Sequence, residues 1–156
     1  MDGAYAPGAA GRLVVLDEHW ACLAALATRD ALGRAAGWDI CRAYVANAAA
    51  DTPGIGASVH LGSGAAGGLA EAVVAAAVLD PDGPWRERAL AFGDLFLRSA
   101  YRPGDAPFLG EPAALVGGFR DGAGDWDVRM DAVQHIGCAL LGVEALRSSP
   151  VAGSLP

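Results

Sequence analysis

The chain has 156 residues, a formal net charge of −7 and a pI near 4.7, and 53% of its residues are hydrophobic. This length suits one domain or part of a larger one, and the hydrophobic share is sufficient for a core. All basic residues are arginines, and they are scattered among carboxylates instead of forming the basic stripe that phosphate binding requires, so nucleic acid is not an expected partner.

Two helices are predicted in the N-terminal third of the chain. The first covers residues 16–32, where apolar side chains such as Trp20 follow helical spacing. The second covers residues 38–50, with glycines flanking the junction between the two helices. A glycine-rich stretch over residues 54–68 is predicted as a long loop, a kind of connection that is often functional. His60 lies in it, without the preceding strand or following lysine of a phosphate-binding loop.

Three further helices are predicted. Residues 68–79 are apolar nearly all round, which is typical of a helix buried on most sides. The next helix covers residues 84–101, with Asp82 as its expected N-cap. Its expected buried face consists of Trp85, Ala89, Phe92 and Phe96. A second long connection over residues 103–130 leads to the last helix, over residues 131–147.

These elements predict an all-α fold of stacked antiparallel helical hairpins. The expected organisation is an irregular segment over residues 1–14, a helical-hairpin domain over residues 15–147 and a flexible tail over residues 148–156.

The sequence favours a soluble, cytoplasmic protein. Cys22, Cys41 and Cys138 lack the spacing of a disulfide framework, so a reducing compartment is expected. The N-terminus lacks the basic and apolar regions of a signal peptide. No run approaches the ~18 uninterrupted apolar residues of a membrane span, since the most apolar one is short and is interrupted by Glu71. The acidity is compatible with a bound cation, with a neutral or cationic substrate, or simply with solubility.

The densest group of polar residues lies in the stretch Gly117–Arg147. Asp131 and His135 are four residues apart on one predicted helix, so they share a face and would orient a general base or provide two metal ligands. The alternative is that Asp131 caps the helix while His135 bonds to a loop carbonyl. Cys138, one turn further on, would form a nucleophilic dyad with His135, but we favour the alternative that it packs as a small apolar residue.

A second candidate site is the start of the first helix, Asp17-Glu18-His19-Trp20. Here Glu18 or Asp17 would act as a general acid or base beside Trp20, an aromatic platform for substrate. The alternative is an ordinary acidic first turn with Trp20 in the core.

A third candidate is the pair Arg120 and Arg129, which flanks a loop rich in aspartate. Together these residues would form a ligand clamp, or they would hold the loop through arginine–carboxylate hydrogen bonds. For Arg129 we favour pairing with Asp131 or with Asp127, because a charged residue just before a helix readily pairs there.

A family resemblance rests on the C-terminal motif. Gly117-Gly-Phe119, an acidic loop and then Asp131-x-x-Gln-His135-x-x-Cys-Ala-Leu-Leu-Gly142 resemble the closing repeat of α/α-toroid proteins. That group includes terpenoid cyclases, protein prenyltransferase β subunits and sugar-processing toroids. The run Leu16-Asp-Glu-His-Trp-Ala-Cys-Leu-Ala-Ala-Leu26 resembles the start of another inner helix of such a ring. The chain supplies fewer helices than a closed ring, so it resembles only the C-terminal hairpins.

The resemblance implies a central cavity lined by the starts of the inner helices. It also raises the alternative of a zinc site, because the closing-repeat histidine of protein prenyltransferases binds zinc beside an Asp-x-Cys pair. His135 lies at the resembling place, and Asp39-Ile-Cys41 has the form of that pair. The glutamine–tryptophan repeat and the aspartate-rich protonation motif of triterpene cyclases do not occur in the sequence.

We therefore interpret the chain as an enzyme, or part of one, that acts on a small carbohydrate or isoprenoid-like substrate in this cavity. The expected catalytic residues are His135, Asp131, His19 and Glu18. The expected substrate-binding residues are Trp20, Phe119, Arg120, Trp126 and Arg129. No metal ligand is assigned and no cofactor is expected apart from the zinc alternative. The competing interpretation is a non-catalytic fragment that completes a helical ring with a partner chain, as a homo- or hetero-oligomer.

Overall fold

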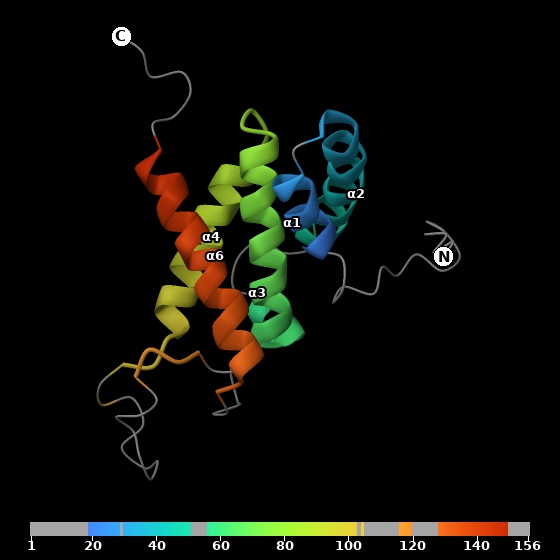
Figure 1. The fold of residues 1–156 in the computed structure, drawn as a ribbon. Helices are drawn as coiled ribbons and strands as arrows, with labels where there is room; N and C mark the ends of the chain where they lie inside the picture. Colours follow the sequence, from blue (N-terminus) through green and yellow to red (C-terminus); the bar gives the residue numbers. More distant parts are fainter. Residues whose placement is uncertain are drawn as a thin grey trace.

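The computed structural model describes residues 19–28, 30–50, 56–102, 104, 116–119 and 128–149, with backbone only for residues 47–50 and 56–63. Its helices are α1 (His19–Ala27), α2 (Ala31–Ala50), α3 (Gly56–Leu79), α4 (Trp85–Ser99) and α6 (Met130–Ser148) (Figure 1). The prediction of an all-α fold is confirmed for this part of the chain. None of these helices has the length and the apolar character needed to cross a membrane.

Helix α3 lies at the centre and packs against each of the other four helices (Figure 1). Residues of α3 and α6 that lie next to each other follow the chain in the same direction, since Gly64 is next to Asp131 and Gly67 is next to His135. Helices α3 and α6 are therefore parallel. The chain reverses direction between α1 and α2 and again between α3 and α4, so each pair forms an antiparallel hairpin, as predicted.

Helix α3 is buried, as the sequence predicts, but it is longer than predicted. Leu69, Val73 and several alanines of α3 are fully buried. The helix begins at Gly56, so the predicted loop over residues 54–68 is wrong from residue 56 onward, and His60 is helical. Glycine is disfavoured in a helix by about 1 kcal/mol relative to alanine. Here that penalty is offset because the small residues of α3 let neighbouring helices approach closely.

The boundary between α1 and α2 also differs from the prediction. A single helix was expected over residues 16–32, yet α1 ends at Ala27 and α2 already begins at Ala31. The physical reason is an N-cap, because the Asp30 carboxylate accepts a hydrogen bond of 2.6 Å from the backbone N–H of Gly33. Gly37 lies inside α2, where a Cβ atom would stand 2.8 Å from that of Ala25 in α1.

Replacing Asp30 with alanine is expected to lower the free energy of unfolding by about 1 kcal/mol, because the first turn of α2 loses the acceptor for one of its free N–H groups. Urea denaturation of Asp30→Ala and Asp30→Asn would measure this. The asparagine side chain retains a capping oxygen, so Asp30→Asn should have a free energy of unfolding close to that of the parent protein. Equal losses in both variants would show that the cap does not hold this boundary.

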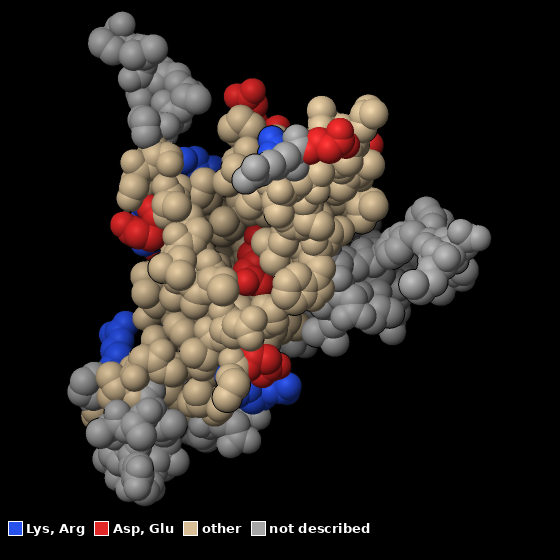
Figure 2. Space-filling model, in the orientation of Figure 1, with Lys and Arg blue, Asp and Glu red and all other residues tan. Residues whose placement is uncertain are grey.

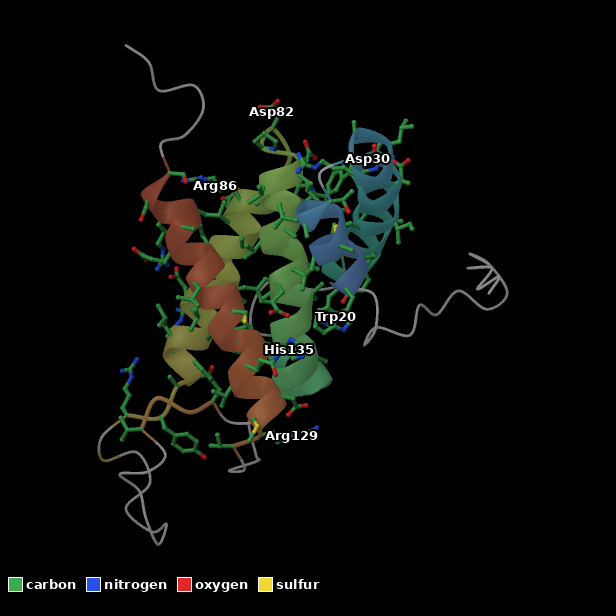
Figure 3. The ribbon with its side chains drawn as sticks, viewed as in Figure 1. Trp20, Asp30, Asp82, Arg86, Arg129 and His135 are labelled. Atoms are coloured by element: carbon green, nitrogen blue, oxygen red, sulfur yellow. A yellow bond between two sulfur atoms is a disulfide. The ribbon has the colours of Figure 1, made fainter. Side chains whose placement is uncertain are left out.

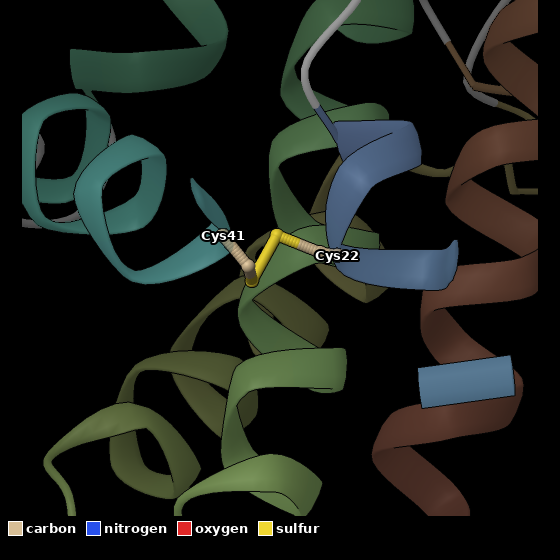
Figure 4. The surroundings of a disulfide bond; sticks show 2 residues. All are labelled: Cys22 and Cys41. Atoms are coloured by element: carbon tan, nitrogen blue, oxygen red, sulfur yellow. A yellow bond between two sulfur atoms is a disulfide. The ribbon is translucent and has the colours of Figure 1, made fainter. Parts of the chain in front are cut away.

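A disulfide joins Cys22 of α1 to Cys41 of α2 (Figure 4). Both cysteines are fully buried, and their Cα atoms are 4.7 Å apart. The expectation of no disulfide is therefore wrong, because two cysteines 19 residues apart become neighbours only when the hairpin folds back on itself. The cysteine argument for a reducing compartment consequently loses its basis.

Helix α4 buries the predicted face, since Trp85, Ala89, Phe92 and Phe96 are all buried. The expected cap is wrong, because Pro84 is the N-cap residue and no side chain caps this helix. In the turn before α4, the Asp80 carboxylate accepts a hydrogen bond of 3.1 Å from the Trp85 indole N–H.

Gly117 and Gly118 lie in a turn that pairs with the segment following α4. Tyr101 donates its N–H to the carbonyl of Gly118 at 2.9 Å and accepts one from Gly117 at 3.1 Å. Gly117 has φ +88°, a conformation that L side chains rarely adopt. The turn places Phe119 in the core, 7% exposed, with its ring centroid 6.5 Å from that of Phe96.

Candidate functional site

Three side chains from three helices meet near the middle of α3. The Nδ1 atom of His135 (α6) lies 2.7 Å from Oε2 of Glu71 (α3). The Nε2 atom of His19 (α1) lies 3.8 Å from the same oxygen. The two imidazole rings stand edge to face, with centroids 5.0 Å apart. We call these three residues the His–Glu–His cluster.

Two glycines of α3 make room for the cluster. A Cβ atom at Gly67 would lie 2.8 Å from the Cβ of His135, and one at Gly68 would lie 3.3 Å from Nδ1 of His19. The histidine-bearing helices can therefore approach α3 on two sides of the same turn. Glu71 follows one turn later, and i, i+3 and i, i+4 positions share a helix face. Its carboxylate consequently projects between the two imidazoles.

The cluster is largely shielded from solvent. The side chains of Glu71 and His19 are 8% and 5% exposed, while that of His135 is 18% exposed. A buried carboxylate is unfavourable unless hydrogen bonds or positive charge compensate it. Here the two imidazoles flank the carboxylate, so protonation of a histidine or binding of a cation would compensate its charge.

Cys138 lies beside the cluster, one turn after His135, and is exposed. The expectation that it packs as a small apolar residue is therefore wrong. Although the residue is exposed, partial desolvation of its thiol, the negative charge of Glu71 and a hydrogen bond to the Glu71 carboxylate together raise the pKa of the Cys138 thiol above its ordinary value. The thiol is thus held in its protonated form, in which it donates to the carboxylate.

Trp20 lies beside both imidazoles. Its ring centroid lies 4.6 Å from that of His19 and 6.3 Å from that of His135. Figure 3 shows Trp20 and His135 approaching each other from α1 and α6. Trp20 is 55% exposed, because the buried face of α1 runs through His19, Cys22 and Ala25. The alternative that placed Trp20 in the core is therefore wrong.

The cluster opens onto a hollow. Helices α1 and α6 both pack on α3, but among the described residues they make no close backbone contact with each other. Figure 2 shows a largely uncharged face with acidic atoms in a hollow over α3, between α6 and α1. Glu71 is the only acidic residue of α3. The surface therefore presents one carboxylate at the bottom of a depression with uncharged walls.

Two of the predicted catalytic residues meet in the cluster, and Asp131 does not join them. Instead Asp131 accepts two hydrogen bonds from the Arg129 guanidinium, at 3.1 and 2.9 Å. Both side chains are about half exposed, and Arg129 lies at the N-terminal end of α6 (Figure 3). The predicted Asp131–His135 pair is replaced by Glu71–His135, while the favoured Arg129–Asp131 pairing is confirmed. The alternative that Asp131 caps the helix is wrong, because the N-cap is Arg129 without a side-chain bond.

The pKa of Asp131 is lower than its ordinary value. Desolvation raises the pKa, but the Arg129 hydrogen bond, backbone hydrogen bonds and the Arg129 charge outweigh it. A lowered pKa in the folded state means that the stabilisation is present at neutral pH and is lost as the pH falls through that pKa. We expect Arg129→Ala to move the Asp131 carboxyl titration upward in an NMR pH series. An unchanged midpoint would contradict the pairing; Arg86→Ala is the matched control.

The zinc alternative built on Asp39 and Cys41 is wrong. Cys41 is bonded to Cys22, and Asp39 pairs with Arg42 at 3.4 Å on the exposed side of α2. The remaining predicted site residues, Glu18, Arg120 and Trp126, lie outside the described residues.

Glu71 is the functional candidate that the sequence interpretation missed. It was noted only as an interruption of an apolar run, yet a lone carboxylate in a buried helix requires polar partners. Those partners could not be named, because His135 is 64 positions away in the chain.

Each member of the cluster offers one ligand atom, and these atoms all lie within 4.8 Å of one another, so the three residues are candidates to hold a metal ion. Carboxylate and imidazole are also the groups that most often move protons in enzymes. No protein-family model, curated protein or solved structure matches the chain, so the interpretation of this site rests on its geometry.

Proposed function

We propose that the chain is an enzyme, or part of one, that acts on a small uncharged molecule bound in the hollow between α1 and α6. The reacting atom of the substrate would lie at the His–Glu–His cluster. One observation carries the proposal: the Glu71 carboxylate is buried between two imidazoles at the bottom of a hollow with uncharged walls. Acidic and basic side chains that converge in a concave, mostly apolar site are typical of enzyme centres.

The surroundings of the cluster support a carbohydrate or isoprenoid-like substrate. The exposed ring of Trp20 offers an apolar face beside both histidines, suited to stacking on a sugar ring or an isoprenoid chain. The clustering of His19 and His135 near the starts of α1 and α6 also accords with the resemblance to α/α toroids, whose cavities lie at the starts of inner helices.

Ligand-observed NMR tests this proposal with two probe sets, methyl glycosides and short prenyl alcohols. The parent protein is expected to bind members of one set and to shift its Trp20 indole N–H resonance. Trp20→Ala and Glu71→Gln should each weaken binding roughly tenfold, about 1.4 kcal/mol. Leu32→Ala is the control, since Leu32 is 82% exposed on α2. The proposal would be refuted if Trp20→Ala and Glu71→Gln bound the probes as tightly as the parent protein, or if the parent protein bound neither probe set.

A second candidate is a non-catalytic fragment that completes a helical ring with another chain. Large apolar side chains favour it: Leu141 of α6 is 75% exposed and Val78 of α3 is 51% exposed. Multi-angle light scattering over a concentration series tests this candidate. A dimer or larger species that Leu141→Asp dissociates would support it, whereas a monomer at all concentrations would exclude self-assembly.

A further inference from the structure

We propose that His19, Glu71 and His135 bind one divalent transition-metal ion. The inference extends the proposed function, because it assigns a chemistry to the same cluster. Its basis is that three ligand-type atoms from three helices, two imidazole nitrogens and a carboxylate oxygen, lie within 4.8 Å of one another. Two histidines and one carboxylate form the ligand set of several catalytic zinc and non-haem iron centres.

The spacing of these atoms suits a metal centre. Bonds of about 2.1 Å in a tetrahedral arrangement place ligand atoms roughly 3.4 Å apart. The separation of the ligand atoms is 2.7 Å for Glu71–His135 and 3.8 Å for Glu71–His19, so the two distances lie on either side of that value. The Glu71 oxygen is shared by both pairs, so small side-chain rotations would direct all three atoms to one point.

Burial supports a cation in this position. The Glu71 carboxylate and the His19 ring are at least nine-tenths buried, and the partners described for the carboxylate, His135 and the Cys138 thiol, carry no fixed positive charge. A divalent ion neutralises a buried carboxylate without protonating a histidine, because imidazole binds metals in its neutral form. Gly67 and Gly68 keep the backbone of α3 close to both histidines, so the ligands sit on rigid helices.

The donor set also indicates the kind of metal. Calcium and magnesium prefer oxygen ligands, whereas two imidazole nitrogens favour zinc, cobalt, nickel or copper. Three protein ligands leave at least one coordination position for water or substrate. His135 is the most exposed of the three and lies next to Trp20, so we place the open position on the hollow side of the cluster.

The test uses the full chain after treatment with a chelator, titrated with Co²⁺ and then with Zn²⁺. We expect one equivalent of Co²⁺ to bind, with the visible absorption of a low-coordinate site, and Zn²⁺ to displace it. His19→Gln, Glu71→Gln and His135→Gln should each weaken binding at least about 100-fold, since even second-shell partners of a metal are worth 10- to 100-fold. Circular dichroism establishes that each variant is folded.

Two control variants exclude other binding groups. Asp131→Asn removes the carboxylate of the original sequence prediction, and Asp39→Asn removes an exposed carboxylate of α2; both should retain the parent affinity. The parent protein alone can overturn the inference, because absence of Co²⁺ and Zn²⁺ binding at micromolar concentrations would do so without any variant. Loss of binding in Cys138→Ser with retention in Glu71→Gln would likewise refute it.

The outcomes separate this inference from the proposed function. A protein that binds a probe from the NMR sets through Trp20 and Glu71, but binds neither metal, would overturn only the metal site. A protein that binds one metal ion through the cluster, but none of the probes, would overturn only the proposed function.

Discussion

Replacing Gly67 with alanine is expected to lower the free energy of unfolding by about 1–3 kcal/mol, the usual range for overpacking a filled interior. The new methyl group would lie 2.8 Å from the Cβ of His135 and 3.0 Å from the backbone nitrogen of Ile136. Neither atom can turn away, so α6 must move off α3. The same movement would separate His135 from Glu71 and weaken the binding of any ligand at the His–Glu–His cluster.

Gly137 provides a matched control, because it lies in the interior of α6 and a Cβ there would meet nothing within 4 Å. Gly137→Ala should raise stability by about 0.5–1 kcal/mol through the higher helix propensity of alanine. Urea denaturation of both variants measures the two effects, and the His135 ring resonances report the displacement. If the two variants had equal stability, close packing of α3 against α6 would not be the reason for glycine at position 67.

Removing the Cys22–Cys41 bond by a double alanine substitution is expected to lower stability by about 3 kcal/mol, the value for a loop of this length in the chain-entropy account. The effect should also reach the cluster, since His19 lies one turn before Cys22 on the short helix α1. We therefore expect weaker metal binding in the double variant even where it remains folded.

Cys138→Ala serves as the comparison, because it removes a cysteine thiol but no disulfide. Alkylation of the denatured, unreduced protein followed by mass spectrometry should modify Cys138 alone. Alkylation of all three cysteines, or equal stability of the double variant and Cys138→Ala, would contradict the disulfide.

Local periodicity was sufficient to predict helix α4 and its buried face. Trp85, Ala89, Phe92 and Phe96 recur at helical spacing, and each is buried in the fold. The spacing of apolar residues is visible within a few turns of one helix. The buried face of that helix can therefore be predicted without knowing which other helices pack against it. The same reasoning identified α3 as a buried helix from its apolar residues.

Helix boundaries were less predictable where glycine is common. Residues 56–68 were expected to form a loop, and the glycines at 33 and 37 were expected to separate two helices. Intrinsic propensity disfavours glycine in helices, but packing against a neighbouring helix can reverse that preference. Such packing depends on both helices, so it cannot be predicted from the sequence of one helix alone.

The sequence by itself determined that the described segments are helical and that α3 and α4 bury their apolar residues, and it singled out His19 and His135 as polar residues of interest. Only the tertiary structure decided their partner. Asp131, four residues from His135, was the nearest carboxylate in the chain, yet Arg129 holds it on the surface. Glu71, 64 positions from His135, is the carboxylate that meets both histidines. Spacing along one helix defines which residues share a face, whereas a contact between helices depends on how closely they pack, and here two glycines of α3 permit that approach.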